Sequence, residues 1–204
     1  GSRFANIFAP KGSTEATGGV GTSLGDNTPT EDLYGKYEEG DLRRDISIGH
    51  ISDGRMYCKK FVVAPVLPNQ SDANFIVLRY ADVLLMYAEA LNELTGTYNI
   101  PSWNEATTYT ISRDKEQMER GIHPVRIRAG LPDYPDEFYL QSGVDDMRKA
   151  LKRERMIELM GEGKRYFDIR RWKDAPVEES LQIYGCNVFV GEAKRDEFHS
   201  AIPV

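Results

Sequence analysis

Glu154 and Glu158 are acidic residues whose spacing could carry out chemistry on a substrate. They lie one helical turn apart in residues 144–160, where apolar residues recur with the period of an amphipathic helix. Two carboxylates about 5–10 Å apart beside a cleft can cleave a glycosidic bond, one as the acid and the other as the base or nucleophile. The pair is therefore a candidate for hydrolytic chemistry.

The surroundings of the two glutamates favour a structural role over a catalytic one. A projection at about 100° per residue places both in the middle of the apolar face of their helix. That face carries Met147, Ala150, Leu151 and Ile157. A buried carboxylate needs a cation or a hydrogen-bond donor, and breaking such a pair typically costs about 3–5 kcal/mol. Cationic partners keep a carboxylate ionised, so neither glutamate is predicted to have the raised pKa of an acid catalyst.

The next helix, expected from about residue 164 to 173, supplies the nearest arginines outside the glutamates' own helix. These cations are Arg165, Arg170 and Arg171. We predict that they neutralise the two glutamates and so form a buried clasp, a set of ion pairs that joins the two helices. The clasp is predicted to be a structural joint and not a ligand site, because structural ion pairs perturb carboxylates as readily as catalysis does.

The geometry of the clasp depends on the short connection between its two helices. Gly161 and Gly163 permit a tight reversal of the chain there. Apolar and aromatic residues spread over more than half of the circumference of the second helix, which predicts that other parts of the protein surround it. These residues are Tyr166, Phe167, Ile169 and Trp172.

Composition and charge exclude several classes of protein. The 26 Lys and Arg are outnumbered by 32 Asp and Glu, and the net charge of −6 argues against a nucleic-acid partner. No apolar run is long enough to span a membrane. The histidines at positions 50, 123 and 199 are isolated from one another, so no metal site is predicted. The pairing of Cys58 and Cys186 stays open.

The chain changes character near residue 70. Residues 1–70 contain much Gly, Ser and Thr and have strand-like runs around Asp53-Gly54, which predicts a loop-rich segment with a short β-hairpin. The glycines of residues 11–30 miss the pattern of a phosphate-binding loop, so no cofactor is predicted. Residues 71–204 are expected to form a helical domain, with a second hairpin between Tyr98 and Ile111.

The first helix of this domain is expected to begin near Asn74 and to end near Gly96. Its predicted apolar face carries Leu78, Ala81, Leu84, Leu85, Ala88, Leu91 and Leu94. Its predicted polar side carries Arg79, Asp82, Glu89 and Glu93. Arg79 and Asp82 could pair across one turn of this side.

A further helix is expected to begin at Ser112 and to end at Gly130. Its predicted apolar stripe consists of Met118, Ile122, Val125 and Ala129. Pro124 removes one helical hydrogen bond, so we expect a kink near His123 or a break into two pieces.

Three segments of the chain resemble the C-terminal portion of the SusD/RagB family of nutrient-binding lipoproteins. These segments are FIVLRYADVLLMYAEALNE, HPVRIRAGLPDY and KRERMIELMGEGKRYFDIRRWKDA. They occur in the order and spacing of the family, within a match from about Asp41 to Ala175. The resemblance implies a mainly α fold of tetratricopeptide-like helical hairpins, of the α-solenoid type, with long irregular loops and short β-hairpins.

The resemblance also implies a function. Family members bind oligosaccharides at the surface of gram-negative bacteria, are not enzymes, and deliver nutrient to a SusC-like TonB-dependent transporter in the outer membrane. Because members are much longer and carry an acylated cysteine, we expect this chain to be a fragment of such a lipoprotein. Any contact with the membrane is expected through a lipid anchor that this fragment lacks.

Aromatic rings in loops are the candidates for contact with sugar. Family members stack rings on pyranose faces and donate hydrogen bonds from polar side chains. We select Tyr34 and Tyr37 in DLYGKYEEGD and Trp103 in YNIPSWNEA, because a loop ring flanked by polar groups suits a sugar. For Trp103, packing within the hairpin is the alternative explanation.

Two other functions remain as alternatives. A stack of helical hairpins can serve as a scaffold that docks to a transporter without contacting a glycan. Glycoside hydrolysis by the glutamate pair is the less favoured alternative, because its predicted environment keeps both carboxylates ionised.

Overall fold

A computed structural model describes residues 28–50, 56–61, 74–178, 184–185 and 202–203. The chain divides into two units. The residues before Val77 and those after Glu158 belong to one unit, and Val77–Glu158 form the other. The first division lies close to the change expected at residue 70, whereas the segment expected to be one helical domain, 71–204, is shared between the two units.

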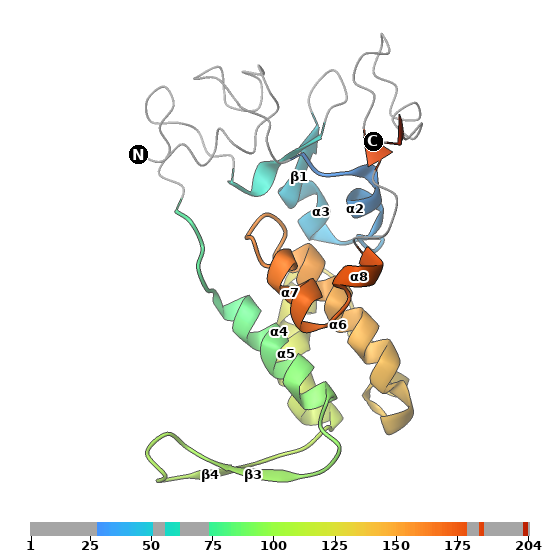
Figure 1. Cartoon of the computed structure of the whole chain (residues 1–204). Coiled ribbons are helices and arrows are strands. Elements are labelled where there is room, and N and C mark those ends of the chain that lie inside the picture. Colours follow the sequence, from blue (N-terminus) through green and yellow to red (C-terminus); the bar gives the residue numbers. More distant parts are fainter. Residues whose placement is uncertain (1–27, 51–55, 62–73, 179–183, 186–201, 204) are drawn as a thin grey trace. The chain divides into compact units, whose positions relative to one another are not determined.

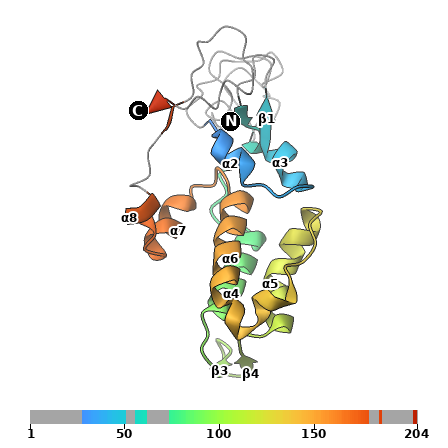
Figure 2. The ribbon, with the colours of Figure 1, turned by 90° about the vertical axis from the view of Figure 1, so that its right-hand side faces the viewer.

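Three helices form the unit of residues 77–158. They are α4 (Tyr80–Asn92), α5 (Lys115–Arg128) and α6 (Val144–Glu158). Helix α4 packs against both α5 and α6, as Figures 1 and 2 show. Two short 3-10 helices, η2 (Asp136–Tyr139) and η3 (Gln141–Gly143), connect α5 to α6. The prediction of a mainly helical fold is confirmed.

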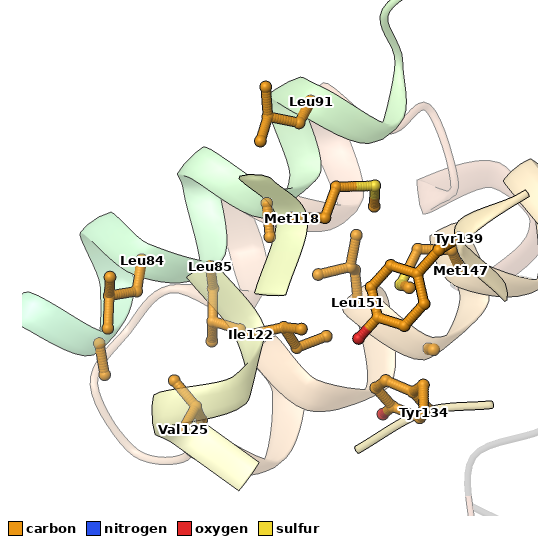
Figure 3. Packing of buried hydrophobic residues seen from close by; sticks show 13 residues of the cluster. Leu84, Leu85, Leu91, Met118, Ile122, Val125, Tyr134, Tyr139, Met147 and Leu151 are labelled. Carbon is orange, nitrogen blue, oxygen red and sulfur yellow. The ribbon is translucent and has the colours of Figure 1, made fainter. Parts of the chain in front are cut away.

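The apolar residues that face the centre of this unit form one core (Figure 3). Its largest aliphatic members include Leu85 and Leu91 from α4, Ile122 from α5, and Met147 and Leu151 from α6. Tyr134 and Tyr139, which precede α6, cover one side of it. All four residues of the stripe predicted for α5 are buried, which confirms the helical period read from the sequence.

Helix α4 departs from the prediction at its start. Its N-cap is Arg79, five residues after the expected Asn74, and no side chain caps it. Leu78 therefore precedes the helix and is 59% exposed, although it was placed on the buried face. Asp82 was placed on the polar side but is buried. The outer side of α4 instead exposes Tyr80, Val83 and Met86, so this helix is apolar on two sides.

Helix α5 runs without a break through Pro124. Ile122 and Val125 flank the proline and both lie in the core, so packing on either side of it favours a continuous helix despite the missing hydrogen bond. The N-cap is Asp114, two residues after the predicted Ser112, and its side chain accepts a hydrogen bond from the Gln117 amide. The predicted end at Gly130 is confirmed.

Between α4 and α5 the chain forms an antiparallel hairpin of β3 (Tyr98–Pro101) and β4 (Thr108–Ile111), as predicted. The register places Tyr98 opposite Ile111 and Ile100 opposite Tyr109. In Figure 1 the hairpin projects from the ends of the two helices that it joins. The loop between its two strands contains an aromatic residue, Trp103, and lies away from the core (Figure 1).

The other unit contains short elements. They are α2 (Glu31–Gly35), α3 (Leu42–Ser47), β1 (Ile48–His50), β2 (Met56–Cys58), η1 (Lys59–Phe61), α7 (Arg165–Arg171), α8 (Ala175–Glu178), β5 (Tyr184–Gly185) and β6 (Ile202–Pro203). The antiparallel pairing of β1 with β2 confirms the hairpin expected around Asp53-Gly54, although residues 51–55 lie outside the described residues. The chain before β1 is helical and not extended, because Asp41 caps α3 by accepting a hydrogen bond from the Arg43 amide.

In the connection before α7, Gly161 and Gly163 both have positive φ angles, of 76° and 70°, which glycine adopts readily. The prediction that α7 is surrounded is wrong. Tyr166 and Phe167 are exposed, and the buried residue of α7 is Asp168. Its aromatic residues contact one another and neighbouring arginines rather than a core.

Cys58 is a free, buried thiol, and burial raises its pKa to about 11. Cys186 lies outside the described residues. Every helix among the described residues is too short or too polar to cross a membrane.

Candidate functional site

Tyr37, one of the three rings expected to contact sugar, is only 7% exposed. The Tyr37 hydroxyl lies 3.7 Å from the Met160 sulfur, and burial raises the pKa of Tyr37 to about 12. A buried ring has no free face for a ligand. The expectation for Tyr37 is therefore wrong, and the residue belongs to the packing of its unit.

Tyr34 lies in α2 and not in a loop, where it is half-buried. The Arg44 guanidinium lies 5.2 Å from the centroid of its ring, and the ring of His50 meets it edge-on at 5.5 Å. These two neighbours already occupy parts of the ring surface, so Tyr34 is a weaker candidate than its sequence context indicates.

Trp103 is 95% exposed, in the loop that joins β3 to β4. Hydrogen bonds within the loop fix the backbone around it. The Ser102 amide donates to the Thr107 carbonyl at 2.7 Å, and the Ser102 hydroxyl donates to the Asn104 side chain at 2.8 Å. Packing within the hairpin does not account for a ring exposed to this degree. Trp103 is an apolar surface with polar groups beside it.

The two faces of the β3–β4 hairpin differ in character. Cross-strand partners share a face, so Tyr98 and Ile100 lie on the same side as Tyr109. All three are exposed. On the other side the Thr110 hydroxyl donates to the Asn99 side chain at 2.9 Å. The hairpin therefore presents further apolar surface in addition to Trp103.

Glu154 is 1% exposed, as its position in the apolar face predicts. Its carboxylate accepts hydrogen bonds from Arg126 at 3.2 Å and from the Tyr134 hydroxyl at 3.0 Å. Arg126 is itself buried, donates to the Pro132 carbonyl at 2.6 Å and lies over the ring of Tyr134. The pair joins α5 to α6 inside the core.

Glu158 is also buried, at the end of α6. Arg79 and Arg128 each donate to its carboxylate at 2.5 Å. Burial raises the pKa of Glu158, but the hydrogen bonds and charges of the two arginines outweigh burial and bring the pKa below its ordinary value of 4.5. A further ion pair, between Asp82 and Arg155 at 2.8 Å, joins α4 to α6.

The partners expected for the two glutamates require correction. Arg165 pairs with Glu178, Arg170 lies over the ring of Tyr166, and Arg171 pairs with Asp168 one turn earlier. The cations that neutralise the glutamates come instead from α5, which supplies Arg126 and Arg128, and from Arg79, the N-cap of α4. Folding brings these distant residues to α6, whereas the arginines of α7 have partners of their own.

This arrangement is not that of a glycosidase pair. An acid catalyst needs a raised pKa, and the pKa of Glu158 is lowered. Glu154 is enclosed by Arg126 and Tyr134 inside the core. Among the described residues, no cluster of His, Cys, Asp and Glu could hold a metal ion. The carboxylates act as structural anchors between helices.

The lowered pKa of Glu158 predicts how stability depends on pH. A lowered pKa in the folded state contributes stability that is present above the unfolded pKa and is lost as the pH falls through the folded pKa. We expect the chain to lose part of its stability below pH 4.5 and Glu158→Gln to lose less over the same interval. Urea unfolding from pH 7 to 3 measures this, and parallel curves for both proteins would contradict it.

These observations define the class of protein. It is mainly helical, and ion-paired glutamates in the core join its packed helices. A model of the SusD family matches residues 2–204, and the chain belongs to this family.

Three relatives show how far the similarity extends. SusD-like protein P2 of Formosa agariphila is 39% identical over 107 residues, which cover 51% of this chain and 18% of that protein. Surface glycan-binding protein A from Bacteroides fluxus is 24% identical, with a TM-score of 0.59, over 87% of this chain and 36% of that one. Surface glycan-binding protein A from Bacteroides thetaiotaomicron is 16% identical, with a TM-score of 0.63, over 97% of this chain and 42% of that one. The two structures show the shared fold, and this chain spans less than half the length of each relative.

Proposed function

We propose that the protein binds glycans at the surface of the outer membrane and delivers them to a SusC-like TonB-dependent transporter, without cleaving them. Membership of the SusD family supports this proposal, as do the two structural relatives that are named as surface glycan-binding proteins. Within the chain, the 95% exposure of Trp103 is the observation that carries it. A large ring held in water by a hydrogen-bonded loop offers a flat apolar face to a sugar.

Trp103→Ala tests the proposal. We expect the chain to bind oligosaccharides on a glycan array, and the variant to bind the same glycan roughly tenfold more weakly in calorimetry, because the stacking surface is lost. Phe167→Ala removes another exposed ring, on α7, and is the matched control. Equal affinities of the wild type and Trp103→Ala would contradict the role of Trp103, and release of reducing sugar would contradict a non-catalytic function.

A scaffold that docks to the transporter is the second candidate function. The exposed apolar residues Tyr80, Val83 and Met86 of α4 favour it, because apolar side chains that recur on the exposed part of a helix suit contact with another protein. Co-purification with a SusC-like transporter that is lost in Val83→Asp but kept in Trp103→Ala, with no glycan bound by the wild type, would favour docking over glycan binding.

A further inference from the structure

A cleft of about 490 Å³ lies among β4, α4 and the first half of α5. Small-molecule sites typically measure roughly 300–1,000 Å³, so this volume suits a ligand. The residues that line the cleft are Tyr87, Thr108, Tyr109, Thr110, Ile111, Asp114, Glu116, Gln117 and Arg120. None of them was selected as a candidate from the sequence.

The apolar part of the cleft has a fixed floor and an exposed ring. Tyr87 and Ile111 are partly buried and pack against the core of their unit, so the floor is anchored. Tyr109 is 57% exposed. The cleft therefore combines a rigid base with an aromatic side chain that a ligand can contact.

The polar part of the cleft holds donors and acceptors in defined positions. Asp114 accepts hydrogen bonds from the Gln117 amide at 3.0 Å and from the Ser112 hydroxyl at 2.7 Å, and the Gln117 side chain accepts one from the Ser112 amide at 3.3 Å. These bonds orient both side chains at the start of α5. A sugar hydroxyl both donates and accepts, and this lining offers partners of both kinds.

Arg120 and Glu116 add a pair of charges that can exchange partners. They bond each other at 2.6 Å on the surface of α5, and both side chains are mostly exposed. An exposed pair one helical turn apart contributes little to stability. Hydroxyl groups of a ligand can therefore replace this contact at small cost.

The charge of the lining selects among classes of glycan. It contains one cation, Arg120, against the acids Asp114 and Glu116. The β3–β4 hairpin, residues 98–111, has no Lys or Arg and one acid, Glu105. A uronic acid or a sulfated sugar would meet more negative than positive charge, whereas a neutral sugar meets none of this repulsion.

We propose that this cleft is a binding subsite for an uncharged oligosaccharide, with the face of one sugar on Tyr109 and its hydroxyls on Gln117 and Arg120. The inference rests on the proposed glycan-binding function and adds to it a site separate from the loop of Trp103 and a class of ligand.

The test compares two tyrosines of the same hairpin. The probes are uncharged gluco-, xylo- and manno-oligosaccharides beside oligogalacturonates of the same length, titrated into the chain in a calorimeter. We expect the wild type to prefer an uncharged probe, and Tyr109→Ala and Gln117→Ala to weaken its binding roughly tenfold. Tyr98→Ala is the control, because Tyr98 lies on the same face of the hairpin but does not line the cleft.

Each result separates this inference from the function on which it rests. Binding by the wild type that neither Tyr109→Ala nor Gln117→Ala weakens overturns the cleft and leaves glycan binding intact. An equal loss in Tyr98→Ala and Tyr109→Ala overturns it as well, because the hairpin and not the cleft is then responsible. A preference for oligogalacturonate overturns the ligand class. A wild type that binds no probe overturns the glycan-binding function together with the cleft.

Discussion

Glu154→Ala is expected to destabilise the unit of residues 77–158 by about 3–5 kcal/mol, the typical cost of breaking a buried ion pair. The substitution leaves Arg126, which is 2% exposed, without the carboxylate that neutralises it and removes the acceptor of the Tyr134 hydroxyl. The Pro132 carbonyl, which accepts a hydrogen bond from Arg126, does not carry a negative charge. Urea unfolding at pH 7 measures the change in the free energy of unfolding.

Asp146→Ala is the matched control for Glu154→Ala. Asp146 lies on the same helix but pairs with Lys149 at 3.6 Å, with both side chains largely exposed. A surface pair of this kind contributes about 0–1 kcal/mol. Similar unfolding midpoints for the two variants would show that the buried pair stabilises the protein no more than a surface pair does.

Gly121→Ala is expected to destabilise the chain although alanine is the better helix former. A Cβ atom at position 121 would lie 2.6 Å from the Leu84 carbonyl oxygen and 2.9 Å from the Ala88 Cβ. The first of these contacts is with backbone, so α4 and α5 must move apart. The strain of overpacking, typically about 1–3 kcal/mol, outweighs the gain in helix propensity of about 1 kcal/mol. Thermal unfolding measures the net effect.

Gly35→Ala provides the comparison for this prediction. Gly35 is also helical, at the end of α2, but nothing lies within 4 Å of a Cβ built there. This substitution is expected to be neutral or slightly stabilising. A melting temperature of Gly121→Ala at or above that of the wild type would mean that the two helices do not pack as closely as the structure indicates.

The helices of residues 77–158 could be predicted because their signal is local. The apolar period of Met118, Ile122 and Val125 identifies the buried side of α5 without knowledge of its partners. The start of α4 could not be placed in the same way. Arg79 caps the helix without a side-chain hydrogen bond, so no capping residue marks the boundary in the sequence.

The burial of Glu154 could also be predicted, but not its partner, because ion pairing between helices depends on the tertiary structure. One signal was present: Arg126 follows Ile122 by four residues and therefore lies on the buried side of α5. No comparable pattern in the sequence indicates that Tyr37 is buried. Its hydroxyl contacts a methionine 123 residues later, and the polar sequence around it resembles that around Trp103.

The cleft beside the hairpin was missed for a related reason. Tyr109 alternates with Thr108 and Thr110, so the sequence indicates an aromatic ring on one face of a strand. Tyr87 and Gln117 come from two helices, and their approach to β4 follows from packing. Sequence patterns thus identify single exposed rings more readily than a site assembled from three elements.

The position of Trp103 also gives the protein an optical reporter. The chain has two tryptophans, and Trp172, on the other unit, is half-buried with arginines near its ring. Indole emission depends on the polarity around the ring, and Trp103 is surrounded almost entirely by water. A molecule that covers this ring changes its fluorescence directly, so occupancy can be followed in solution without a label.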